Sequence, residues 1–360
     1  MFRSSVFGLF LCASLVAQST QQQPAATPQP APATQQQPPA TQQNGQRPPI
    51  RVQVNEVIVP VTVTDEKGRF VSNLEKSDFK VFDSGKEQNI SFFTRERNQP
   101  VVVGFLLDLS NASKIHWKNY QDAATELVYT LLPTDKPNEN RFSGYLITYA
   151  NDAEVAVNTT TDPEKIVERI RKTKPGGGAA LYDAIYKACT SRTLVKGEPI
   201  EPRRIVVIIG DGHDNASSKS LDEVLEVAQR NLVTIYGIST TAYGFANEGD
   251  KNLVRLTQET GGTVEYPLQD VYKDVPGYLE QPSDAGNYAL KVETGGYTSA
   301  LANKMYRAIA SVAGEVTTQY IIRYIPDISD NNKVFRNIKV SVSLPNVKVR
   351  TRHGYFPETP

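Results

Sequence analysis

The chain has 360 residues, of which 39% are hydrophobic and 22% are charged. This is enough for one large or two modest globular domains with packed cores. Lysine plus arginine and aspartate plus glutamate number 39 each, so the formal net charge is zero. A neutral chain has no whole-body field that would draw it onto nucleic acid or an anionic membrane, so we expect no nucleic-acid partner.

The first residues have the pattern of an export signal. Arg3 supplies a positive charge, residues 6–16 form an apolar run, and small residues follow in Ala17-Gln18-Ser19. This order is typical of a cleaved signal peptide, predicted here over 1–19, and it indicates a periplasmic or secreted protein. A lipoprotein anchor at Cys12 is the alternative, but a bulky leucine stands where that motif requires a small residue.

Residues 20–48 are predicted to be a disordered linker. They consist almost entirely of glutamine, proline, alanine and threonine, which cannot build a core. No later apolar run is long enough to span a bilayer, so we expect no transmembrane segment in the mature chain. After removal of the signal only Cys189 remains, and its helical spacing from Leu181 and Ile185 predicts a buried thiol.

Residues 49–99 are predicted to be β-rich. Alternate valines from Val57 to Val63 share one face of a strand, and residues 65–68 form a turn. Further strands are expected at 79–81 and 90–93. Pro60 cannot donate a hydrogen bond to a neighbouring strand, so we expect its strand to lie at an edge or to carry a bulge.

Residues 100–314 alternate between strand and helix. Apolar runs at 101–107, 142–148, 205–209 and 232–238 predict buried strands, and apolar residues at helical spacing around 124–131 predict a helix. Ser220 and Glu223 form a capping box at the start of a helix over 220–231. This alternation predicts an α/β fold with a doubly wound, mostly parallel sheet.

Residues 315–360 return to a β pattern. Strands are predicted at 320–325, 338–344 and 347–352, with Pro345-Asn346 as a tight connection. Each terminal β-rich segment is too small to bury much apolar surface alone. We therefore expect 49–99 and 315–360 to pack as one β-sandwich with the α/β domain inserted between them.

Polar residues directly follow two of the predicted parallel strands. Asp108 and Ser110 follow the first, and Asp211 follows the strand at 205–209. The carboxyl ends of parallel strands are where α/β sheets bind ligands, and carboxylate and hydroxyl oxygens suit Mg²⁺ or Mn²⁺. A glycine-rich loop, Gly176–Gly178, precedes a helix between them.

In these motifs the chain resembles von Willebrand factor A domains and their metal-ion-dependent adhesion site. That site has an Asp-x-Ser-x-Ser motif, a threonine in a later loop and an aspartate after the fourth strand. Asp108, Ser110 and Asp211 match this pattern. The flanking strands, with a closing segment at 347–356 that ends in Gly-Tyr-Phe, resemble those of secreted bacterial proteins with this domain.

The chain departs from the adhesion-site pattern at two positions. Ala112 replaces the second serine and Ala179 replaces the threonine. We therefore expect a degenerate site that binds Mg²⁺ or Mn²⁺ weakly or not at all, because Mg²⁺ needs near-ideal oxygen coordination. Ser113 is a substitute ligand if the loop shifts its register. Alternatively, the aspartates only satisfy loop amides.

An enzymatic function is the weaker interpretation. A serine hydrolase needs a histidine base beside Ser110 or Ser113, and the histidines are His116, His213 and His353. The nucleophile-elbow, P-loop and dinucleotide-binding motifs are missing from the sequence.

A protein partner is expected instead, and two long stretches, 240–252 and 268–299, are rich in aromatic side chains that suit binding loops. The candidate contact residues are Tyr243, Phe245, Tyr278, Tyr288 and Tyr297. Alternatively, these rings fold inward.

Two functions are consistent with this pattern. The first is an exported, non-catalytic, adhesion-type module that binds a protein partner. The second is a metal-independent structural component of the cell envelope that assembles through its β-sandwich.

Overall fold

The computed structural model describes most of the chain beyond the predicted signal peptide and linker, which lie outside the described residues. All described residues belong to one compact unit, Gln53–Pro360. The described ranges are 56–95, 100–114, 117–133, 141–190, 202–241, 248–269, 295–326 and 334–357. For residues 295–300 only the backbone is described.

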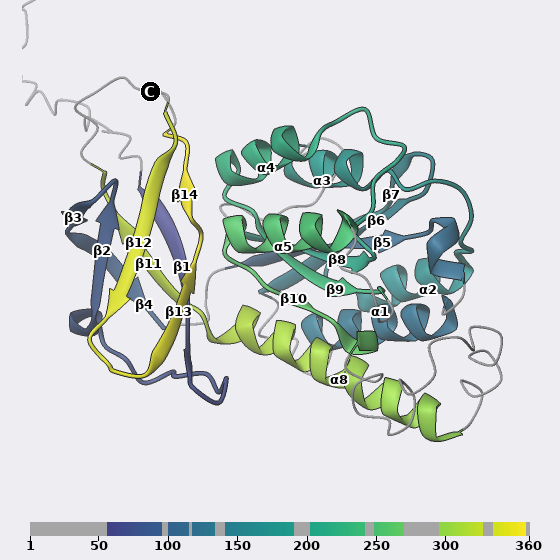
Figure 1. The fold of residues 1–360 in the computed structure, drawn as a ribbon, viewed down its shortest axis with the longest axis horizontal. Helices are drawn as coiled ribbons and strands as arrows, with labels where there is room; N and C mark the ends of the chain where they lie inside the picture. Colours follow the sequence, from purple (N-terminus) through teal and green to yellow (C-terminus); the bar gives the residue numbers. More distant parts are fainter. Residues whose placement is uncertain are drawn as a thin grey trace, which may run out of the picture. The chain divides into compact units, whose positions relative to one another are not determined.

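A six-stranded sheet forms the centre of the α/β domain (Figure 1). Its order is β10-β9-β8-β5-β6-β7, and every neighbouring pair is parallel except β6 with β7. The predicted mostly parallel sheet is confirmed. The strands are β5 (Val101–Asp108), β6 (Phe142–Tyr149), β7 (Ala153–Thr160), β8 (Arg203–Gly210), β9 (Thr234–Ser239) and β10 (Val264–Glu265).

Helices cover both faces of this sheet (Figure 1). One apolar core includes side chains of α1, α2 and α8, and the other includes side chains of α3, α4 and α5. The helices are α1 (Trp117–Leu131), α2 (Pro163–Lys172), α3 (Leu181–Thr190), α4 (Leu221–Arg230), α5 (Glu248–Thr260) and α8 (Gly295–Thr318).

Strand β5 joins the two cores because all of its residues are buried. Phe105 and Leu107 contribute to the core on the α1 face, whereas Leu106 contributes to the core on the α3 face. Two further predictions are confirmed nearby: Ser220 and Glu223 form the capping box of α4, and Cys189 on α3 is buried. Burial raises the pKa of the Cys189 thiol to about 12, so this thiol stays protonated and unreactive at neutral pH.

The segments before and after the α/β domain pair with each other in two four-stranded sheets, ordered β13-β1-β11-β4 and β14-β12-β2-β3. Val57 is opposite Tyr324, and Val81 is opposite Val340. The predicted insertion of the α/β domain between paired β segments is confirmed. The strands are β1 (Val57–Asp65), β2 (Phe79–Asp83), β3 (Lys86–Gln88), β4 (Ile90–Thr94), β11 (Tyr320–Tyr324), β12 (Arg336–Val342), β13 (Val347–Thr351) and β14 (Gly354–Tyr355).

The expectation that Pro60 marks an edge strand or a bulge is wrong. Strand β1 lies between β13 and β11 and keeps a regular register with both. Its pairing with β13 covers only Val61–Asp65, so Pro60 lies just outside the paired stretch. The Pro60 carbonyl accepts a hydrogen bond from Thr351 Oγ1 at 2.9 Å. An inner strand therefore tolerates a proline where one neighbour has already ended.

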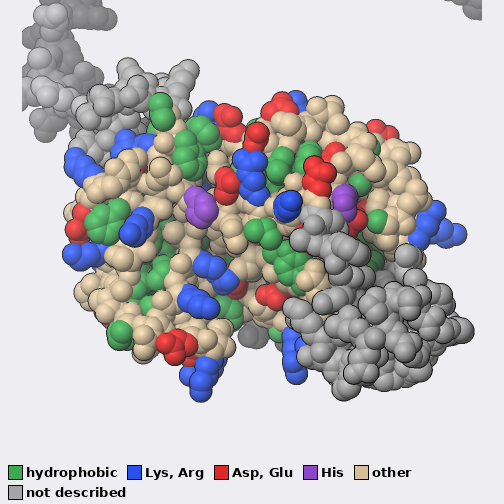
Figure 2. All heavy atoms as spheres, in the orientation of Figure 1, with side chains coloured by type: hydrophobic (Ala, Val, Ile, Leu, Met, Phe, Trp, Pro, Cys, Tyr) green, Lys and Arg blue, Asp and Glu red, His purple; other side chains and the backbone are tan. Residues whose placement is uncertain are grey.

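The α8–β11 connection carries polar contacts between the inserted domain and the β segments. The Gln319 amide donates to Thr62 Oγ1 at 3.1 Å and to Tyr236 Oη at 2.9 Å. Glu315, which is 2% exposed, forms an ion pair with Arg350 of β13. On the face drawn in Figure 2, basic and acidic side chains are interspersed. This fits the neutral composition.

Glu315 makes the stability of the protein depend on pH. Burial raises its pKa to about 7, Arg350 opposes this shift and Glu265 adds to it. A raised pKa in the folded state stabilises the protein below the pKa of the unfolded state, and this contribution is lost as pH rises towards 7. From pH 4.5 to 8, we expect the free energy of unfolding of the native protein to fall by up to ~3 kcal/mol relative to Glu315→Gln.

Urea unfolding of both proteins across this pH range measures the effect. Glu226→Gln, on the exposed side of α4, is the surface control and is expected to change stability by less than about 0.5 kcal/mol. A difference between native protein and Glu315→Gln that stays constant with pH would contradict the prediction.

Candidate functional site

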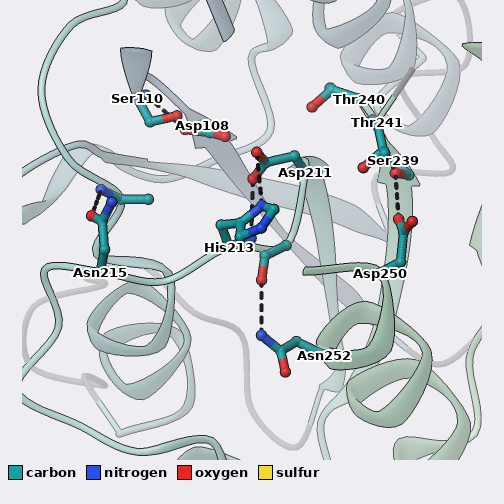
Figure 3. Close-up of polar contacts among 12 residues, drawn as sticks. Asp108, Ser110, Asp211, His213, Asn215, Ser239, Thr240, Thr241, Asp250 and Asn252 are labelled. Atoms are coloured by element: carbon teal, nitrogen blue, oxygen red, sulfur yellow. Dashed lines mark hydrogen bonds and ion pairs between the residues drawn. The ribbon is translucent and has the colours of Figure 1, made fainter. Parts of the chain in front are cut away.

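Loops that follow strands of the central sheet meet at its carboxyl edge, and Figure 3 shows residues of the loops after β5, β8 and β9. The loop after β5 is joined by backbone hydrogen bonds to the end of β6 and to the glycine-rich loop. Leu109 N donates to Tyr149 O at 2.8 Å, and Gly176 N donates to Leu109 O at 2.6 Å. Asn111 N also donates to Gly177 O at 3.0 Å. These bonds hold the predicted site residues on one edge.

Asp108 ends β5 and is only 1% exposed. Its Oδ1 accepts a hydrogen bond from Ser110 N at 2.7 Å, whereas its Oδ2 has no hydrogen-bond partner. Burial raises the pKa of Asp108 to about 6, the Ser110 amide opposes this shift, and the nearby charge of Asp211 adds to it. In Figure 3 the carboxyl groups of Asp108 and Asp211 face each other. The structure therefore brings the two predicted aspartates together.

The next residues form a 3-10 helix, η2 (Asn111–Lys114). This helix sets the direction in which the side chains of residues 112 and 113 point. Ala112 is exposed, whereas Ser113 is 1% exposed. The Ser110 and Ser113 hydroxyls lie close enough to Asp108 to lower its pKa. Neither Oγ atom has a hydrogen-bond partner of good geometry. The turn thus places Ser113, rather than the residue at position 112, beside the aspartate.

Asp211 follows β8 and accepts two contacts from His213. His213 N donates to Asp211 Oδ1 at 3.0 Å, and the ring Nδ1 lies 3.1 Å from Asp211 Oδ2. Gly212 between them has a φ of +79°, and a Cβ at this position would collide with the Gly249 carbonyl oxygen. Only glycine therefore lets the Asp211 loop pack against the start of α5.

Two asparagines that the sequence analysis missed hold the glycine-rich loop. Gly178 N donates to Asn151 Oδ1 at 2.6 Å, and Ala179 N donates to Asn215 Oδ1 at 2.8 Å. Asn151 follows β6 closely and Asn215 lies four residues after Asp211, so their positions near strand ends are the signal that could have identified them. Ala179 itself is 3% exposed and belongs to the apolar core of the α3 face, so its side chain supplies no oxygen.

The donor set fits a hard divalent cation. Asp108 Oδ2, Ser110 Oγ and Ser113 Oγ are buried oxygens without partners, and Mg²⁺ and Mn²⁺ prefer such ligands. Among the described residues, no group of three or more His, Cys, Asp or Glu side chains is placed to hold a metal. The serine hydroxyls are therefore the further side-chain oxygens that lie beside Asp108.

The predicted aromatic contact residues cannot be located in the same way. Tyr243, Phe245, Tyr278 and Tyr288 lie outside the described residues. Tyr297 falls in the first turn of α8, where the backbone alone is described. Their role in binding stays a prediction.

The fold and this edge define the class of the inserted domain. Residues 103–274 match the von Willebrand factor type A domain. The chain thus carries a von Willebrand factor type A (VWA) domain, flanked by antiparallel β segments, and the predicted resemblance is confirmed. VWA domains commonly mediate protein–protein interactions.

Several solved structures are similar over part of the chain. An aerotolerance-related membrane protein from Bacteroides fragilis is 16% identical, with 46% of this chain and 90% of that chain covered and a TM-score of 0.36. The von Willebrand factor domain of the type V pili tip protein Mfa5 from Porphyromonas gingivalis is 18% identical, with coverages of 33% and 40% and a TM-score of 0.28.

Proximal thread matrix protein 1 from the mussel byssus, with a zinc-occupied adhesion-site motif, is 14% identical, with coverages of 64% and 48% and a TM-score of 0.42. These likenesses are loose, so the family assignment rests on the sequence match. No curated protein matches the chain. Within the described ranges, none of the helices combines the length and apolar character needed to cross a bilayer.

Gly212 is predicted to be essential for the geometry of the Asp211 loop. Gly212→Ala forces an alanine into a left-handed conformation and against the Gly249 carbonyl. We expect it to lower the free energy of unfolding by about 2 kcal/mol. The control is Gly176→Ala, because a Cβ there meets only the Lys114 side chain, at 4.0 Å, and should change stability by less than about 1 kcal/mol. Equal urea midpoints for the two variants would contradict the prediction.

Proposed function

We propose that this protein is an exported, non-catalytic binding module that holds a divalent cation and a protein partner at the carboxyl edge of β5 and β8. The supporting observation is the set of three buried, unpartnered oxygens on Asp108, Ser110 and Ser113. A buried polar atom without a partner costs about 1–3 kcal/mol. A cation held at this edge removes that cost for all three oxygens.

Each residue has a distinct role in the proposed site. Ser110 and Ser113 supply hydroxyl ligands, Asp108 supplies Oδ2 together with its negative charge, and Asp211 supplies negative charge. A bound cation would offer a coordination position that a carboxylate of the partner can fill, as the family resemblance implies. Ala179 adds no ligand, and Mg²⁺ gives up its waters reluctantly. We therefore expect weak binding, and the site remains degenerate in composition.

Export is a separate part of the proposal, supported by the signal-like pattern at 1–19. Expression of the full chain in a bacterium, followed by mass spectrometry of the protein recovered outside the cytoplasm, tests this part. We expect the mature chain to begin at Thr20. Recovery only of cytoplasmic protein that retains residues 1–19 would contradict export.

A metal-independent structural role in the cell envelope is the second candidate. The observation that favours it is Ala179, whose side chain lies in the apolar core where the family pattern has a threonine. In that case the protein assembles through its β-sandwich, and the edge at Asp108 contributes only loop hydrogen bonds.

A serine hydrolase is the third and weakest candidate. Neither serine Oγ has a hydrogen-bond partner among the described residues, and the His213 ring faces Asp211 instead. His116 lies outside the described residues. A serine hydroxyl that is not paired with a base is a weak nucleophile. We expect active-serine probes to leave Ser110 and Ser113 unlabelled in the folded protein, and labelling of either serine would revive the enzymatic interpretation.

Calorimetric titration of the EDTA-stripped mature protein with Mg²⁺ and Mn²⁺ tests the cation site. We expect weak saturable binding that Asp108→Ala abolishes, because the variant removes the central carboxylate. Asp152→Ala is the matched control, since this exposed aspartate lies on the neighbouring loop after β6. It should bind like the native protein.

Two outcomes separate the first two candidates. Native binding that is lost only in Asp108→Ala supports a cation-dependent binding module. No binding at millimolar cation would contradict the proposed cation site and favour the structural role.

A further inference from the structure

A buried tyrosine, Tyr149, lies beside Asp108 in the candidate site. Tyr149 ends β6 and is the register partner of Asp108 on β5, and Gly210 ends β8 on the other side of Asp108. Tyr149 belongs to the core of the α3 face and is 1% exposed. Its hydroxyl has no hydrogen-bond partner, although it is enclosed by protein.

Gly210 shows where this hydroxyl lies. A Cβ added to Gly210 would collide with Tyr149 Oη and would come within 2.9 Å of Asp108 Cβ and 3.3 Å of Asp108 Oδ2. The phenol ring therefore reaches across Asp108 and ends over the glycine. Tyr149 Oη and Asp108 Oδ2 both lie close to the position that a Gly210 Cβ would occupy, and neither has a hydrogen-bond partner.

We propose that Tyr149 is a positioning residue of the cation site: its hydroxyl fills the space that Gly210 leaves open and limits the movement of the Asp108 carboxylate on its Oδ2 side. This inference rests on the proposed function. The contact would complete the support of the carboxylate, because Asp108 Oδ1 is already fixed by the Ser110 amide. Fixing a ligand from behind raises metal affinity because the ligand loses less freedom when the metal binds.

The test is the affinity of the mature protein for Mn²⁺, measured by calorimetry. Tyr149→Phe removes only the hydroxyl, and we expect its affinity to fall about tenfold, as for other partners behind a metal ligand. Tyr145→Phe is the matched control on the same strand, because its hydroxyl donates to Ala188 O at 3.4 Å, and it should bind like the native protein.

Two further readouts separate positioning from packing. In Gly210→Ala, the added methyl group collides with Tyr149 Oη and displaces it from Asp108, so we expect loss of measurable Mn²⁺ binding. Mn²⁺ should also perturb the near-ultraviolet absorption of tyrosine in the native protein and in Tyr145→Phe, and this signal should vanish in Tyr149→Phe. If Tyr149 acts in packing alone, Tyr149→Phe should bind Mn²⁺ with the affinity of the native protein and should keep the Mn²⁺-induced change in absorption.

The outcomes distinguish this inference from the proposed function. If the native protein binds Mn²⁺ and Tyr149→Phe binds it equally well, the positioning role is overturned and the cation site stands. If the native protein binds no Mn²⁺ at millimolar concentration, the cation site is overturned and the inference falls with it.

Discussion

The complete burial of β5 is the constraint on which the rest of the molecule depends. A strand whose eight residues are all buried must have neighbours on both edges and helices on both faces. Here β6 and β8 pair with it, and two helical layers cover it. Since these neighbours are parallel to β5, their carboxyl ends coincide with its end. Asp108 is therefore surrounded by Tyr149 and Gly210 as a direct consequence of how the core is built.

The flanking β segments depend on a second buried contact, which closes the insertion. Asp83 of β2 is fully buried, and its Oδ2 accepts hydrogen bonds from Tyr324 and Tyr355 at 3.0 and 2.9 Å. Arg336 Nε donates to Oδ1 at 2.8 Å. A buried carboxylate is tolerated only when it is paired and hydrogen-bonded in this way. All three partners follow the inserted domain, so the N-terminal segment is completed by the far end of the chain.

The candidate site differs from its family pattern in a physically consistent way. The 3-10 turn exposes Ala112, whereas Ser113 is turned inward beside Asp108. Position 179 is packed in an apolar core, and its backbone amide is held by Asn215. Compared with the family pattern, the hydroxyl of the first loop is therefore at position 113 instead of 112, and position 179 in the other loop has none. Asp108 Oδ2, Ser110 Oγ and Ser113 Oγ are left buried at this edge without hydrogen-bond partners.

The sequence by itself determined the features that local burial dictates. The alternate valines from Val57 to Val63 join one apolar core, the apolar run of β5 is buried throughout, and Ser220 and Glu223 cap α4, as their local patterns predict. Only the tertiary structure decided which strands pair, and thereby that Pro60 lies in an inner strand. It also turned Ser113 inward and placed Tyr149 over Gly210. These arrangements arise from contacts between residues far apart in the chain, and a local sequence pattern does not indicate which distant residues it will contact.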